Sequence, residues 1–175
     1  ESAKRAFQWA EDHLDDPMYQ QDADRYNPYK LQQNEVGSER ALAAFYLDRN
    51  YSDAQLKRYV NTFLSIDLNL NDWHTLTLVG GMLRNGEKTD SLYAKCRQAL
   101  LERADEYVSQ SRTVSTGHPH PEHEIVRVVS LLGQRVLILA HQLAGNEKYL
   151  NVLVKASQYG LGANPLNMCY TSGIG

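Results

Sequence analysis

The chain has 175 residues, of which 42% are hydrophobic and 22% charged, and its formal net charge is −3. The 18 Lys and Arg residues are outnumbered by 21 Asp and Glu, which excludes the basic surface that nucleic-acid binding requires. The longest apolar run, residues 136–140, is far shorter than the roughly 20 residues of a membrane-spanning helix, so we expect neither nucleic acid nor membrane as a partner of this globular domain.

Apolar residues recur at helical spacing along almost the whole chain, and no alternation typical of strands occurs, so the pattern predicts an all-α fold. A first helix is predicted from Ala3 to about Leu14, ending before Pro17. A polar, Tyr-rich loop follows through Asn34. Because loops of this length are usually functional, we expect it to face a site or a partner.

Two helices forming an αα-hairpin are predicted next. Ser38 is expected to cap the first helix, and Ser52 or Asp53 the second. The apolar positions are Ala41, Leu42, Phe45 and Tyr46 in the first helix and Leu56, Tyr59, Val60, Phe63 and Leu64 in the second.

A second pair consists of a helix from about Asp72 to the Asn85-Gly86 stop and a long helix through Leu92, Cys96, Leu100, Ala104 and Val108. After a loop over 111–123, a strongly apolar helix is predicted over 125–143, buried on more than one side. Gly145 and Asn146 turn it into a last helix through Leu150, Leu153 and Tyr159. Successive hairpins of this kind suit a bundle, an α-solenoid and an α/α barrel equally well.

Cys96 and Cys169 stand far apart without C-x-x-C spacing, which indicates two buried thiols without a disulfide or a thiolate metal site. The chain opens at Glu1 inside a helical pattern and stops at Gly175 in a Gly-rich turn. We therefore expect a fragment of a larger domain.

Residues 159–175 read YGLGANPLNMCYTSGIG, which resembles the Y-x-L-G-x-N-P-L-x-x-S-Y-V-T-G-x-G motif of glycoside hydrolase family 9. Upstream, AGNEKYL at 144–150 is similar to the family's T-G-D-E-K-Y-L turn. AKRAFQWA at 3–10 and SERALAA at 38–44 resemble its A-x-x-A-W-x-W and D-E-x-x-W-A-A helices, and the Trp73 segment is loosely similar to W-x-x-x-x-L-G.

The resemblance implies that residues 1–175 are part of one (α/α)6-barrel catalytic domain that cleaves β-linked gluco-oligosaccharides or cellulose-like glycans by inversion. In that family the general base comes from a D-A-G-D motif upstream, and the general acid from a D-x-x-x-N-E motif downstream. Neither motif occurs here, so we expect no catalytic residue in this segment, and no hydrolysis by the segment alone.

Departures from the family pattern leave the substrate open. Glu124 to Arg127 stand where the family has W-G-S-N, and Leu42 stands at its helix-start Trp, which removes two aromatic platforms. An exo-acting β-glucosaminidase or an oligosaccharide-specific member is therefore one alternative. A non-catalytic α-hairpin scaffold that binds through its loops is another.

The residues expected to contact an oligosaccharide or polysaccharide are Trp73, His74, His120, Glu124 and Tyr170. An indole can stack on a pyranose, although a Trp packed in the core is an equal alternative for Trp73. Glu124 is hypothesised to pair with a sugar amine. Tyr26 and Tyr29 could also stack on sugar, but we favour solvated loop positions for them.

The His-rich loop 118–124 holds three imidazoles and two carboxylates, which suits a divalent metal, direct substrate contact or a merely exposed loop. Its spacing matches no standard zinc motif. No cofactor is predicted, and no acidic loop suited to calcium is present, although calcium is common in the resembling family. The expected partners are thus the carbohydrate and the remainder of the barrel; the compartment stays open, with export the usual case among polysaccharide-degrading relatives.

Overall fold

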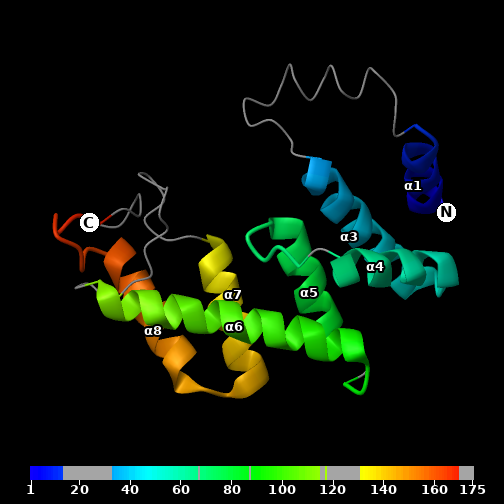
Figure 1. Cartoon of the computed structure of the whole chain (residues 1–175). Helices are drawn as coiled ribbons and strands as arrows, with labels where there is room; N and C mark the ends of the chain where they lie inside the picture. The colour runs from blue at the N-terminus through cyan, green and yellow to red at the C-terminus, as the bar shows by residue number, and fades with distance from the viewer. Residues whose placement is uncertain (14–32, 67, 87, 115–116, 118–130, 170–175) are drawn as a thin grey trace. The chain divides into compact units, whose positions relative to one another are not determined.

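The computed structural model describes residues 1–13, 33–66, 68–86, 88–114, 117 and 131–169, with the side chains of 33–36 and 131–132 left aside. Within these ranges every helix is an α-helix and no strand occurs, which confirms the all-α prediction (Figure 1). The helices are α1 (Ser2–Asp12), α3 (Gln33–Tyr51), α4 (Ala54–Ile66), α5 (Trp73–Asn85), α6 (Ser91–Thr113), α7 (Leu131–Ala144) and α8 (Glu147–Gly160). No helix in the described part of the chain is long and apolar enough to span a membrane. The chain divides into two compact units, residues 1–86 and 87–175.

In the first unit, α3 packs against both α4 and α5, and the α3–α4 hairpin is confirmed. Asp53, one of the two predicted caps, accepts a hydrogen bond from the backbone N–H of Gln55 at 3.0 Å, while Ser52 adopts a left-handed φ of 51° in the turn. The core of this unit consists of Ala41, Ala44, Phe45, Leu47, Leu56, Val60, Leu64, Leu70, Leu76, Leu78, Val79 and Leu83.

Two expectations for α3 are wrong. The helix begins at Gln33, five positions before the expected cap Ser38, which is instead 1% exposed inside the helix. The Ser38 side chain hydrogen-bonds the carboxylate of Asp72 in the adjacent helix cap, so its polar group is used between elements. Tyr46 is 49% exposed, because α3 turns Phe45 and not Tyr46 toward α5.

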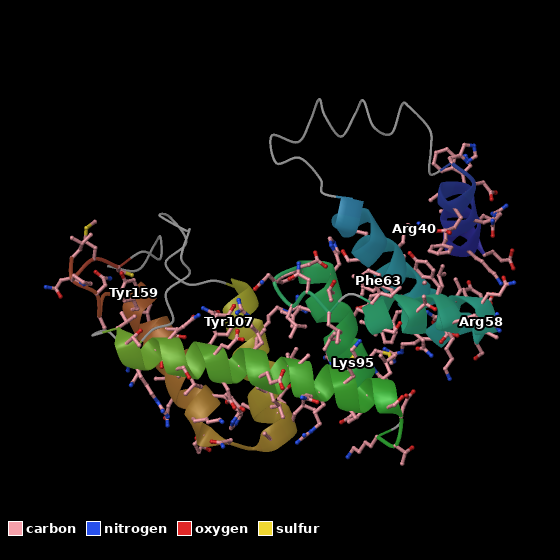
Figure 2. The ribbon with its side chains drawn as sticks, viewed as in Figure 1. Arg40, Arg58, Phe63, Lys95, Tyr107 and Tyr159 are labelled. Atoms are coloured by element: carbon pink, nitrogen blue, oxygen red, sulfur yellow. The ribbon has the colours of Figure 1, made fainter. Side chains whose placement is uncertain are left out.

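Helix α1 packs on the rest of the first unit, and none of its residues is buried. It contacts α3, where Nε and Nη2 of the Arg40 guanidinium donate to the two carboxylate oxygens of Glu11, with Nε 2.7 Å from Oε1. Figure 2 shows Arg40 on the side of α3 that faces α1. At the other end of α1, Lys4 forms an ion pair with Asp53. The helix ends at Asp12, and Leu14, its expected end, lies outside the described residues.

The predicted bounds of α5 are confirmed. Asp72 is its N-cap, accepting a hydrogen bond from the backbone N–H of Thr75 at 2.6 Å, and Gly86 is its C-cap. Such a cap satisfies one of the amide groups that the first helical turn leaves without a partner.

In the second unit, α6 packs against α7 and α8, and α7 against α8. Tyr107 of α6 meets α7 at Gly133, where a Cβ would lie 3.2 Å from the Tyr107 ring. The predicted turn between α7 and α8 is confirmed: Gly145 has a φ of 62°, and the Asn146 side chain accepts from the Lys148 N–H. The core consists of Leu92, Tyr93, Cys96, Leu100, Ala104, Tyr107, Val108, Val136, Leu137, Leu139, Ala140, Tyr149, Val152 and Ala156.

Helix bounds and faces in this unit differ from expectation in two places, the end of α6 and the buried face of α8. Helix α6 runs on to Thr113, so Ser111, expected to open a loop, is a buried helical residue. Residues 125–130 of the helix expected over 125–143 lie outside the described residues. In α8 the buried side chains are Tyr149, Val152 and Ala156, whereas Leu150, Leu153 and Tyr159 are half-buried. Cys96 is buried and Cys169 half-buried, and neither forms a disulfide.

Candidate functional site

The connections of the first unit separate into a short-turn end and a long-loop end. Helices α3 and α4 are joined by two residues, whereas α1–α3 and α4–α5 are joined by longer segments. The start of α3 and the start of α5 lie together at the long-loop end, since the side chains of Ser38 and Asp72 are hydrogen-bonded. Because binding residues of helical scaffolds concentrate on long loops and the helix ends beside them, this end is the candidate site.

Trp73 is the first residue of α5 at this end and is 46% exposed. Its indole is therefore not packed in the core of the first unit. Of the two alternatives for Trp73, packing in the core does not describe its place in this unit. An indole face accessible to solvent is the geometry that stacking on a pyranose needs.

His74 follows it and lies between two carboxylates. Its Nε2 is 3.7 Å from Oε1 of Glu39, and its Nδ1 is 3.6 Å from Oδ1 of Asp72. Both distances exceed a hydrogen bond, and Nδ1 is buried without a hydrogen-bond partner among the described residues. The imidazole thus lies between two carboxylates without a hydrogen bond to either of them.

Glu39 was not among the candidate residues of the sequence analysis. Its carboxylate is 44% exposed and lies beside the imidazole of His74, although the two residues are 35 positions apart in the sequence. The one signal for Glu39 in the sequence is its position after Ser38, in the segment that resembles the family's D-E-x-x-W-A-A helix.

Asp72 is unsuited to proton transfer. Burial acts to raise the pKa of its carboxyl, but hydrogen bonds from Thr75 and Ser38 and the charge of His74 outweigh burial and hold the pKa below its ordinary value. A general acid of a glycosidase needs the opposite shift. The carboxylate therefore caps α5 and orders the site without serving as its acid.

A groove of about 570 Å³ lies between α1 and α3. Its walls are mostly apolar, with Ala3, Ala6, Phe7 and Leu47 among them. Its charged lining residues are Glu11, Glu39 and Arg40, of which Glu11 and Arg40 bind each other. Its lining contains no indole, so the Trp73 end suits stacking on a sugar ring better.

In the second unit, the chain forms a hydrogen-bonded turn as it leaves α8, and Figure 2 labels Tyr159 near the end of that helix. Gly162 has a φ of 118°, a positive value that glycine adopts readily where a helix ends. Asn164 is 5% exposed, and its side-chain amide bonds four backbone groups of this segment. The chain after α8 therefore follows a defined path set by the Asn164 side chain.

The remaining predicted site residues lie outside the described residues: His120, Glu124 and Tyr170, together with Tyr26, Tyr29 and the rest of the His-rich loop. Among the residues that are described, no group of three or more His, Cys, Asp or Glu side chains could hold a metal ion.

The family model of glycosyl hydrolase family 9 matches residues 1–175, the whole chain. No curated protein and no solved structure matches the chain. The helical hairpins described above are consistent with part of an (α/α)6 barrel. The chain therefore belongs to glycosyl hydrolase family 9, the glycoside hydrolases, whose substrates are carbohydrates.

Proposed function

We propose that residues 1–175 form part of one (α/α)6-barrel catalytic domain that hydrolyses β-linked gluco-oligosaccharides or cellulose-like glycans with inversion, and that they supply part of its carbohydrate-binding wall. The observation that carries this is the half-exposed Trp73 beside His74 and Glu39 at the long-loop end of a family 9 chain. An aromatic face flanked by an imidazole and a carboxylate is a typical sugar-binding combination, because the ring covers the apolar face of a pyranose while the polar groups bond its hydroxyls.

The catalytic carboxylates belong, in this proposal, to segments outside residues 1–175. Inversion needs a protonated acid and a base about 6.5–9.5 Å apart. Asp72, the least exposed carboxylate beside Trp73, is committed to a helix cap and has a lowered pKa, which supports placing the acid elsewhere. Residues 1–175 alone are accordingly expected to be inactive.

Tyr170, His120 and Glu124 complete the proposed wall. The resemblance of residues 159–175 to the family motif supports Tyr170, and the replacement of the family's W-G-S-N by Glu124 to Arg127 supports a role for the His-rich loop in substrate choice. If Glu124 pairs with a sugar amine, an exo-acting β-glucosaminidase is the second candidate, since a carboxylate selects a cationic sugar electrostatically.

The test is hydrolysis by the enzyme that contains this chain with the segments on both sides of it. Cello- and chito-oligosaccharides are supplied in parallel, and the anomer first released is followed by NMR. We expect cello-oligosaccharide cleavage with the α-anomer released first. A β-anomer would contradict inversion, and selective chito-oligosaccharide cleavage that E124Q abolishes would establish the second candidate instead. Comparing the flanking sequence with D-A-G-D and D-x-x-x-N-E checks where the carboxylates lie.

A further inference from the structure

The turn after α8 is organised by one buried amide. The Asn164 Nδ2 donates to the carbonyl oxygens of Tyr159 at 2.9 Å and Met168 at 2.7 Å, and its Oδ1 accepts from the N–H groups of Leu166 at 3.1 Å and Met168 at 3.3 Å. The side chain thus uses both of its donor hydrogens and both acceptor positions. We call residues 159–168, held in this way, the Asn164 clamp.

All four partners belong to the clamp itself and none to another helix of the unit. The amide therefore fixes the path of a loop and does not join helices. Both backbone groups of Met168 are bonded to it, so the orientation of that peptide, and with it the direction in which the chain leaves at Cys169, is set by Asn164.

The clamp buries little apolar surface. Leu161, Leu166 and Met168 are 57%, 66% and 56% exposed, so the large apolar side chains of the clamp add little to the core. Two residues near Asn164 have left-handed backbones, Gly162 and Asn167, the latter at a φ of 50°. A defined loop shape kept without core burial is typical of a segment whose geometry serves binding or catalysis.

The clamp also lies at the long-loop end of the second unit. The α7–α8 turn at the opposite end has only two residues. Gly117, four residues after the last residue of α6, lies against Lys155 in the last two turns of α8. The end of α6 and the end of α8 that leads into the clamp therefore lie at the same end of the unit.

We propose that Asn164 is a positioning residue for glycoside hydrolysis, acting on substrate through the loop path that its four hydrogen bonds impose at the end of α8. It is not a catalytic residue, because its polar atoms are all bonded within the clamp. This inference rests on the proposed carbohydrate hydrolysis but not on the β-gluco specificity.

The decisive variant is N164D, which keeps the side-chain shape but replaces the NH2 group, with its two donor hydrogens, by a carboxylate oxygen. At neutral pH its carboxylate would face the carbonyl oxygens of Tyr159 and Met168, so the clamp opens. We expect kcat/KM to fall on the order of tenfold, since two buried hydrogen bonds are lost. When the introduced carboxyl is protonated, below about pH 5, it again donates one hydrogen bond, so the ratio of variant to wild-type kcat/KM should rise as the pH falls.

Two further variants separate positioning from a merely structural role. N164A lacks any donor and should lose activity without recovery at low pH. N151D makes the same chemical change at an exposed position of α8 and should match wild type throughout. Each is assayed in the whole enzyme, at a temperature where thermal melts show every variant folded, on the cello- or chito-oligosaccharide that wild type cleaves fastest.

Equal kcat/KM for N164D and N151D would overturn the proposal, as would a loss that is independent of pH. Failure of both N164D and N164A to fold would overturn it too, because Asn164 would then stabilise the fold itself. A wrong substrate class shows separately, in wild type alone, as activity on a different glycan; the same variant comparison is then made with that glycan.

Discussion

The ring of Phe45 on α3 lies so close to Gly81 on α5 that a Cβ placed at Gly81 would be 2.6 Å from Cε1 and 2.8 Å from Cζ of the ring. Phe45 is 7% exposed, and a buried aromatic ring cannot move aside without displacing its neighbours. We therefore predict that G81A lowers the free energy of unfolding by about 1–3 kcal/mol, the usual cost of overfilling a packed core.

The matched control is G37A in α3. There a Cβ would make ordinary contact with Cε2 of Phe63 at 3.5 Å, and alanine favours a helix over glycine by about 0.5–1 kcal/mol. Urea unfolding of both variants should give shifts of opposite sign. G81A with wild-type stability would mean that α3 and α5 do not approach each other as closely as described.

The bidentate pair between Arg40 and Glu11 is predicted to hold α1 on the first unit. Since α1 buries no side chain, this pair and the Lys4–Asp53 ion pair at the other end of the helix carry much of its attachment. R40K keeps the charge but loses the planar fork, and should weaken the docking of α1 by about 0.5–1 kcal/mol, given that both side chains are about one-quarter exposed.

Amide hydrogen exchange measures this locally, because α1 can open without global unfolding. Exchange should accelerate in α1 in R40K and stay unchanged in α5. R58K, an exposed position on α4 (Figure 2), is the control and should leave α1 as it is. Equal exchange of α1 in R40K and R58K would show that the pair contributes nothing.

The N-cap Asp72 gives the first unit a defined acid dependence. Its pKa in the folded chain is below its ordinary value, because hydrogen bonds from Thr75 and Ser38 outweigh burial. A carboxyl with a lowered pKa stabilises the fold above its unfolded pKa, about pH 4, and that contribution is lost as the pH falls through the folded value. D72A should therefore cost about 1 kcal/mol at pH 7, and progressively less below pH 4.

D72N is the comparison variant, since asparagine also caps helices well. It should cost less than D72A at pH 7 and, lacking a titrating group, should show a weaker loss of stability in acid than wild type. Denaturant unfolding between pH 2.5 and 7 measures all three proteins. A constant difference between wild type and D72A across that range would refute the lowered pKa.

Local signals in the sequence were enough to predict several elements. The bounds of α5 follow from an Asp cap and an Asn-Gly stop, and the α7–α8 turn from Gly145 and Asn146, because these residues act on the backbone within a few positions. Ser38 shows what such local signals cannot predict. It is a good cap by type, but its actual partner is the Asp72 carboxylate, and no local pattern shows that contact.

The same reason explains the other misses. The buried face of α8 consists of Tyr149, Val152 and Ala156, because the rotation of this helix is set by its packing on α6 and α7. Glu39 joins His74 only when α3 and α5 pack together. Periodicity alone left bundle, solenoid and barrel equal, whereas the motif at 159–175 pointed to the family, since it depends on many residues at fixed spacing.

The exposed indole of Trp73 leads to a prediction about substrate affinity. If it stacks on a sugar ring, W73A in the whole enzyme removes an interaction of about 0.5–1.5 kcal/mol, which corresponds to a roughly two- to tenfold rise in KM. Stacking of this kind is present in both the ground state and the transition state, so kcat should change much less than KM. W73F should retain part of the affinity.

The matched control for W73A is Y51A, because Tyr51 is similarly exposed at 44% but stands at the short-turn end of the first unit. Y51A should leave both KM and kcat unchanged. Steady-state kinetics on a series of oligosaccharides of increasing length tests the prediction: a KM for W73A that equals that of Y51A at every length would place Trp73 away from the substrate.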